Sequence, residues 1–251
     1  MSKILKKFCG IFGYKLLTKN YIKNKNYLTE HSSLNIKKII LNLVEKKNIS
    51  SLIQIGANDG VTHDHLHDII KKHRLKSLLL EPIESHFLDL KKNYLNFPNV
   101  KIENSALSVN NDISFLYKVN PEYSKIYGTL SSGISSFDKD HLIKHGIKAK
   151  HIVKENVNQI SFDQLLNKHN INNFDLLLID TEGYDCNIVS NFFIKIKNIR
   201  PFVVFEWSHI KNIELRNTLD LLIINNYSFF SVGDDIFCFP IEKNVSFQQN
   251  I

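Results

Sequence analysis

The sequence predicts an α/β fold, in which a mostly parallel sheet is covered by helices on both faces. Short, almost continuous apolar segments alternate with segments of helical periodicity, as is typical of parallel strands buried on both sides. Near the end of the chain this alternation stops, and Gly233-Asp234 joins two apolar segments as an antiparallel hairpin. The predicted strands of the sheet are 52–55, 77–80, 100–102, 175–179, 202–205, 227–232 and 235–240.

Amphipathic periodicity predicts the helices between these strands. The first helix, 33–47, begins after a serine cap, which is either Ser32 or Ser33. Ser161 is a similar cap for a helix that ends near residue 169. The other predicted helices are 62–73, 84–95, 213–225 and one that begins near residue 184.

The chain of 251 residues is predicted to hold a basic N-terminal extension, residues 1–32, and one domain, residues 33–251. Within the domain, residues 112–118 predict an extra strand and residues 151–160 an extended segment. Between them, residues 119–150 contain the sequence GTLSSGISSF and predict a long irregular loop. Loops of this length in compact domains are usually functional or disordered. We expect this one to cover a substrate, and a loop without a functional role is the alternative.

The excess of positive charge lies at the N-terminus. Basic residues number 32 and acidic residues 25, a net charge of +7, and seven lysines precede the first acidic residue, Glu30. The rest of the chain is therefore close to neutral, whereas a nucleic-acid enzyme more often carries a basic face around its active site. Residues 3–17 place apolar residues at helical spacing between lysines. They fit an amphipathic helix on an anionic membrane and equally a helix packed on the domain.

The cysteines and the hydropathy pattern bear on location. Cys9, Cys186 and Cys238 are far apart and form no CxxC pair, so they predict neither a disulfide framework nor a zinc site. No apolar run reaches the roughly 20 residues that a membrane-spanning helix needs. We therefore predict a cytoplasmic protein, with peripheral contact at the inner face of the membrane if residues 3–17 bind lipid. The sequence leaves the oligomeric state open.

A glycine-containing turn follows the first strand, with the sequence Gly56-Ala57-Asn58-Asp59-Gly60. Glycines let the backbone turn tightly and approach a ligand closely, and the free N–H groups of a following helix favour an anionic group. The dinucleotide fingerprint GxGxxG is absent because residue 58 is Asn, which argues against NAD. Gly56, Ala57, Asn58 and Gly60 are candidate cofactor-binding residues, although such a turn is also common for purely structural reasons.

Polar residues follow the next two strands. Glu81 ends the second strand, where an acidic side chain can accept both ribose hydroxyls of a bound nucleoside. Asn104, Ser105 and Ala106 follow the third strand and are candidates to contact an adenine ring. A helix-capping acid and an ordinary loop of small residues are the structural alternatives.

Acidic residues and a histidine follow the fourth and fifth strands. Asp180 and Glu182 come directly after the most apolar strand, and Glu206 and His209 after the next one. Each is a candidate to remove a proton from a hydroxyl or to bind a substrate, although helix capping by Asp180 is compatible with that role. Oxygen and imidazole side chains also suit several divalent ions. The expected proximity of these four residues is the one argument for a metal ion, and we predict no metal site.

A second group of histidines, His63, His65 and His67, resembles a metal motif. On a helix, His63 and His67 would share one face and His65 would not. We predict no metal role for these histidines, and a local supporting role in the turn for Asp64.

These motifs together resemble the FkbM-type methyltransferases. The matching residues are IGANDG at 55–60 with Asp64, LEP at 80–82, IDTEGYD at 179–185 and FEWSH at 205–209, in the family's order over residues 50–240. Two departures leave the acceptor open: Trp207 stands where this branch often has His, and no proline follows Asp64.

The resemblance implies a Rossmann-like class I methyltransferase fold with its C-terminal antiparallel hairpin, S-adenosylmethionine as cofactor, and transfer of a methyl group to a hydroxyl. The implied partner is a small molecule or a sugar of a surface glycan, with polysaccharide biosynthesis as the setting, and not a nucleic acid. Two alternatives remain. One is a module that binds S-adenosylmethionine without turnover. The other is a nucleic-acid methyltransferase, which would more often show a motif such as DPPY.

Overall fold

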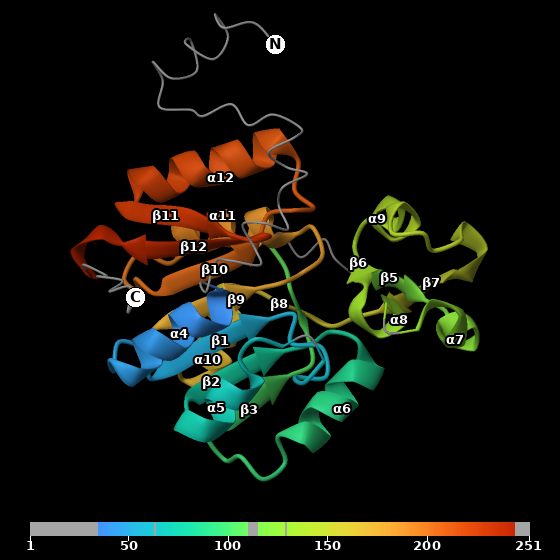
Figure 1. Ribbon diagram of the computed structural model, residues 1–251, viewed down its shortest axis with the longest axis horizontal. Coiled ribbons are helices and arrows are strands. Elements are labelled where there is room, and N and C mark those ends of the chain that lie inside the picture. Colours follow the sequence, from blue (N-terminus) through green and yellow to red (C-terminus); the bar gives the residue numbers. More distant parts are fainter. Residues whose placement is uncertain (1–34, 63, 110–114, 129, 244–251) are drawn as a thin grey trace, which may run out of the picture. The chain divides into compact units, whose positions relative to one another are not determined.

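A seven-stranded sheet forms the centre of the computed structural model, which describes residues 35–62, 64–109, 115–128 and 130–243 (Figure 1). Every pairing in this sheet is parallel except the two made by β12, which runs opposite to both of its neighbours. The predicted C-terminal hairpin is therefore confirmed. Across the sheet the strands are β11 (Tyr227–Val232), β12 (Asp235–Pro240), β10 (Phe202–Glu206), β9 (Leu176–Ile179), β1 (Ser51–Ile55), β2 (Lys76–Leu80) and β3 (Val100–Glu103).

Both faces of this sheet are buried, because alternate side chains of each central strand enter different cores. In β2, Leu78 and Leu80 pack in one core and Leu79 in the other. The first core is closed by α10 (Phe162–His169), α11 (Asp185–Lys195) and α12 (Asn212–Ile224), and the second by α4 (Ile36–Glu45), α5 (His67–His73) and α6 (Glu84–Asn93). Burying one such leucine contributes roughly 1.5–3 kcal/mol, which explains the nearly continuous apolar strands.

Two helix ends show how local hydrogen bonds set the boundaries. At α10, Ser161 accepts from the Gln164 N–H while the Gln164 side chain accepts from the Ser161 N–H, a capping box that confirms the predicted start. The predicted helix at 62–73 begins later, at His67. The side chains of Asp59 and Asp64 accept backbone N–H groups in the preceding segment, which stabilises turns in place of the first helical turn.

The later start of α5 removes the expected helical face of histidines. His63 lies outside the described residues, and His65 is exposed before the helix. His67 packs edge-on against Tyr94, with ring centroids 5.5 Å apart.

The prediction of an irregular loop at 119–150 was wrong. Residues 115–156, called the insertion below, contain a three-stranded antiparallel sheet in the order β6 (Ser135–Ser136), β5 (Phe115–Val119) and β7 (Ile152–Asn156). Val119, Ile134, Leu142 and Ile147 form a small core of their own. The short helices of the insertion are η1 (Pro121–Tyr123), α7 (Ser124–Tyr127), α8 (Leu130–Gly133), α9 (Lys139–Lys144) and η2 (Ala149–His151).

Two short strands connect the insertion to the main sheet. β4 (Ala106–Leu107) and β8 (Gln159–Ile160) pair in parallel, one before and one after the insertion. A single helical turn, η3 (Ile241–Lys243), follows the hairpin.

Several predictions concern residues that the structure does not describe. The amphipathic segment 3–17, Cys9 and the serine caps before α4 lie outside the described residues. The boundary between an extension and a domain at residues 32 and 33 therefore stays a prediction. Among the helices in the described ranges, none has the length and apolar character to cross a membrane.

Candidate active site

A cavity of about 390 Å³ lies at the carboxyl ends of β1, β2 and β9. Ligands of open α/β sheets bind at this edge, and the volume falls within the roughly 300–1,000 Å³ of small-molecule sites. The opposite wall comes from the insertion. Of the residues predicted from the sequence, those that line the cavity are Gly56, Ala57, Asn58, Glu81, Ser105, Ala106, Asp180, Glu182 and His209; Gly60, Asn104 and Glu206 do not line it.

Gly56 makes the turn at the end of β1 against the end of β9. Its φ is +83°, and a Cβ atom on this residue would lie 1.8 Å from the carbonyl oxygen of Asp180. The N–H groups of Gly56 and Ala57 both donate to the carbonyl of Leu80 at the end of β2. Only glycine permits this close approach of three strand ends.

Gly60 and Asn58 shape the turn in different ways. A Cβ atom on Gly60 would lie 2.5 Å from Leu90 and 2.6 Å from Tyr94, so this glycine is required by packing against α6. Asn58 adopts a φ of +49°, and its side chain donates to the carbonyl of Ser132 in the insertion at 2.9 Å. Asn58 thereby links the two walls of the cavity.

Glu81 is a buried carboxyl group, with 4% of its surface exposed. One oxygen accepts the N–H of Asn58 and the other the N–H of Ile83, each at 2.9 Å. Burial raises its pKa to about 7, although these two hydrogen bonds act to lower it. Each oxygen keeps a second lone pair, so the group can accept further hydrogen bonds from a ligand.

Gln54 is a cavity residue that the sequence analysis missed. It is the one polar side chain between Leu52 and Ile55 in β1, and it is 4% exposed. Its Nε2 lies 3.4 Å from Asp64 Oδ2, and its Oε1 has no hydrogen-bond partner among the described residues. A buried acceptor without a hydrogen-bond partner destabilises the protein when no ligand is bound. The sequence feature that could have identified Gln54 is a polar residue inside an apolar strand.

The segment after β3 contains one residue that stabilises the end of a strand and one that lines the cavity. The side-chain amide of Asn104 donates to the carbonyls of Glu81 and Pro82, at 3.0 and 3.3 Å, so it braces the end of β2. Ser105 lines the cavity but donates its hydroxyl to Glu103 at 2.9 Å. Lys168 and His169 also bind Glu103.

Acidic groups are concentrated at the end of β9. Asp180 lines the cavity and is open to it, but desolvation and the nearby carboxyl groups of Asp185 and Glu182 raise its pKa well above the usual range. Asp185, which the sequence analysis did not assign, is fully buried and accepts the Thr181 hydroxyl at 2.9 Å. Burial raises the pKa of Asp185 to about 7.

The insertion supplies residues that the sequence analysis did not identify. Ile134, Phe137 and His145 line the cavity. Ser136 donates to the carbonyl of Glu182 at 2.8 Å, and His141 Nε2 lies 2.8 Å from Glu182 Oε2. The insertion is thus held against the acidic end of β9 by polar contacts. Their donors lie in the segment interpreted as an irregular loop, so their positions were not predictable.

The fold and the site define the class of the protein. A mainly parallel seven-stranded sheet with β12 reversed, helices on both faces and a cavity above the ends of β1 and β2 are the features of the class I methyltransferase fold.

The chain belongs to the FkbM methyltransferase family. The family model described as the methyltransferase FkbM domain matches residues 54–229, which cover most of the sheet and the whole insertion. The matched region is therefore a methyltransferase domain. No curated protein matches the sequence.

The similarity to solved structures is distant. The methyltransferase FkbM from Methylobacillus flagellatus KT is 12% identical with a TM-score of 0.46, and the match covers 76% of this chain and 44% of that one. The chain thus spans less than half the length of that protein. The O-methyltransferase from Bacillus cereus in complex with SAH is 12% identical with a TM-score of 0.44, and the match covers 94% of this chain and 97% of that one. The family match, and not these similarities, carries the assignment.

Proposed function

We propose that the protein transfers a methyl group from S-adenosylmethionine to a hydroxyl oxygen of a small molecule or a sugar. Membership of the FkbM methyltransferase family supports the reaction class. The observation that carries the choice of donor is the buried carboxyl group of Glu81, which lies beside the close turn at Gly56 on neighbouring strands.

The residues of the cavity fit the three polar parts of this donor. Glu81 has free acceptor capacity for the two ribose hydroxyls. Gly56 and Ala57 line the cavity at the turn after β1, and this part of the lining is assigned to the methionine portion. Gln54 Oε1, which is buried without a partner among the described residues, can accept from the methionine ammonium group. Ser105 and Ala106 form the wall assigned to adenine.

When bound, S-adenosylmethionine supplies a methyl carbon on a positively charged sulfur: the acceptor oxygen bonds to this carbon, the carbon–sulfur bond breaks, and its electron pair stays on sulfur. The chain itself must align the acceptor and exclude water. Asp180 lines the cavity next to the Gly56 turn, and we assign it to take the hydroxyl proton. Glu182 and His209, which line the cavity, are assigned to the acceptor side, and Glu206 is assigned to support His209, whose Nε2 lies 3.3 Å from Glu206 Oε1.

The insertion is assigned to acceptor recognition. Leu130, Ile134, Phe137 and His145 line the side of the cavity opposite the strand ends. A wall that mixes apolar, aromatic and imidazole groups suits a molecule with both apolar faces and hydroxyls. The preference for a sugar of a surface glycan rests on the family resemblance.

Calorimetric titration with S-adenosylmethionine tests the proposal. We expect binding to the wild-type protein and no binding of NADH. Glu81→Ala should weaken donor binding by about 100-fold, since two hydrogen bonds to a charged acceptor are lost at roughly 1.5–3 kcal/mol each, partly offset by water. Asp180→Ala should change donor binding far less and abolish turnover.

Glu84→Ala is the matched control, because Glu84 is an exposed acid three residues after Glu81 at the start of α6. This variant should bind the donor as the wild type does. Absence of donor binding in a folded wild-type protein would refute the proposal. Equal losses in Glu81→Ala and Asp180→Ala would refute the division of roles.

A further inference from the structure

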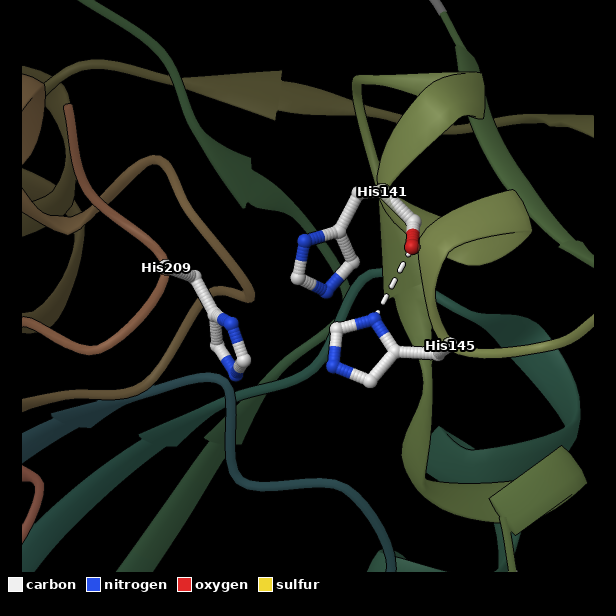
Figure 2. Close-up of side chains that lie close together, drawn as sticks. All are labelled: His141, His145 and His209. Carbon is white, nitrogen blue, oxygen red and sulfur yellow. Dashed lines mark hydrogen bonds between the residues drawn. The ribbon is translucent and has the colours of Figure 1, made fainter.

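Three histidines from two distant segments meet beside the cavity (Figure 2). His141 and His145 are four residues apart at α9, so their side chains project from the same side. His209 follows the carboxyl end of β10, a strand inside the main sheet. The ring centroids are 4.4 Å apart for His141 and His145, and 4.8 Å apart for each of these with His209. His141, His145 and His209 are called the histidine cluster below.

The nitrogens of the histidine cluster converge. Each histidine offers one ring nitrogen, and these three atoms all lie within 4.8 Å of one another. His145 Nδ1 lies 2.9 Å from the carbonyl oxygen of His141. A carbonyl can only accept, so Nδ1 carries the proton and His145 Nε2 keeps its lone pair in the neutral ring. Metal-binding histidines usually donate their other N–H in this way.

Two carboxylates adjoin the histidine cluster. Glu182 Oε2 lies 2.8 Å from His141 Nε2 and 4.0 Å from His209 Nε2. Glu206 Oε1 lies 3.3 Å from His209 Nε2. Neutral imidazoles carry no charge, so two carboxylates would balance the charge of a divalent cation.

The backbone at Glu182 is a separate sign of a constrained site. Its φ is +53°, a left-handed conformation that is uncommon for glutamate and costs on the order of 1 kcal/mol. This conformation accompanies a side chain that reaches two histidines from different segments. Strained residues of this kind concentrate at functional sites.

We propose that the three residues of the histidine cluster bind a divalent transition-metal ion of the Zn²⁺ type, with Glu182 hydrogen-bonded to His141. Imidazole nitrogens suit Zn²⁺, whereas Mg²⁺ prefers an all-oxygen shell. Zinc-bound nitrogens at 2.0–2.1 Å in a tetrahedral shell lie about 3.4 Å apart. The side chains would therefore move together by roughly 1 Å, which torsion about their χ angles can supply.

The location connects the ion with the acceptor. Glu182, His145 and His209 line the cavity, as does Glu81 at the donor end of the same cavity. An ion held by three histidines would keep one coordination position open, and there it could bind an acceptor hydroxyl and stabilise its deprotonated form. This role rests on the proposed function, but the binding of the ion does not.

The full chain without a histidine tag, stripped of metal with a chelator, is titrated with Zn²⁺ by calorimetry. Co²⁺ is added to a second sample as a spectroscopic probe, because tetrahedral coordination gives Co²⁺ a strong visible absorption. We expect one equivalent of Zn²⁺ to bind and the Co²⁺ absorption to appear. His145→Ala and His209→Ala should each weaken Zn²⁺ binding by about 100-fold or more.

His65→Ala is the control, because His65 is an exposed histidine outside the cavity lining, and it should leave Zn²⁺ binding unchanged. Circular dichroism verifies that each variant is folded. A folded wild-type protein that binds no Zn²⁺, or equal Zn²⁺ affinity in the wild type, His145→Ala and His209→Ala, would overturn the metal site.

Donor titration of the same samples separates this proposal from the proposed function. Zn²⁺ binding without S-adenosylmethionine binding would support the metal site and refute the proposed methyl donor. Donor binding without Zn²⁺ binding would support the proposed methyl donor and refute the metal site.

Discussion

Glu81 combines a structural role with the proposed role in donor binding. Its two oxygens accept N–H groups from the glycine turn and from the segment that leads into α6. Its burial makes the ionised form costly, so the carboxyl group is poised to change charge near neutral pH. A ligand that supplies hydroxyl donors would stabilise the ionised form.

The first prediction concerns the pH dependence of donor binding. Burial raises the pKa of Glu81 to about 7, and the ionised carboxylate is the better acceptor for ribose hydroxyls. Donor affinity should therefore rise between pH 6 and pH 8 and level off above the pKa. Calorimetry across this range measures the change. Glu81→Gln, which has no proton to lose there, should flatten the profile, and a profile of the same steepness in that variant would contradict the assignment.

At the scale of elements, the site depends on close contacts between strand ends. The turn after β1 meets the end of β9 at Gly56 and the end of β2 through the Leu80 carbonyl. The apolar strands place these ends at one edge of the sheet, and the glycine allows them to touch. The glycine turn therefore contributes to stability as well as to the proposed donor site.

Gly56→Ala is predicted to destabilise the protein by roughly 3 kcal/mol, the sum of a positive-φ cost and an overpacking cost. The added Cβ would lie 1.8 Å from a backbone oxygen, which cannot rotate away. Urea unfolding measures the loss. Gly146→Ala is the control: its φ of +87° is close to the +83° of Gly56, but nothing lies within 4 Å of its Cβ position. Equal losses in the two variants would show that the contact with Asp180 is unimportant.

For the whole molecule, buried carboxyl groups link stability to pH. Burial raises the pKa of Glu81 and of Asp185 to about 7, from ordinary values of 4.5 and 3.8. Between the ordinary and the raised pKa, the folded protein binds more protons than the unfolded chain. The contribution of these groups to the free energy of unfolding therefore falls as pH rises from about 4 to 7 and is constant above that range.

Asp185→Asn should remove part of this dependence. Asn keeps an oxygen for the Thr181 hydroxyl but cannot ionise. The variant should become more stable than the wild type as pH rises from 4 to 7, with a gain on the order of 4 kcal/mol at pH 8. Chemical unfolding at pH 5 and pH 8 measures the difference. The same change in stability at both values would contradict a pKa near 7.

The sequence by itself determined the main sheet, because burial on both faces demands continuous apolar strands, and such strands are visible without a structure. The hairpin at Gly233-Asp234 and the cap at Ser161 were equally predictable, since both depend on neighbours within a few residues. Most of the candidate donor residues line one cavity, because parallel strands bring their carboxyl ends to one edge.

Only the tertiary structure decided the wall of the cavity that the insertion forms, which is the proposed acceptor side. The insertion has short strands and helices, each too brief to leave a periodic pattern, and its small core forms from residues far apart in sequence. His141 and His145 lie more than 60 residues before His209, and neither local propensity nor spacing indicates that they meet. Packing of the insertion against the end of β9 brings these rings together, so the candidate metal site is a product of long-range contacts alone.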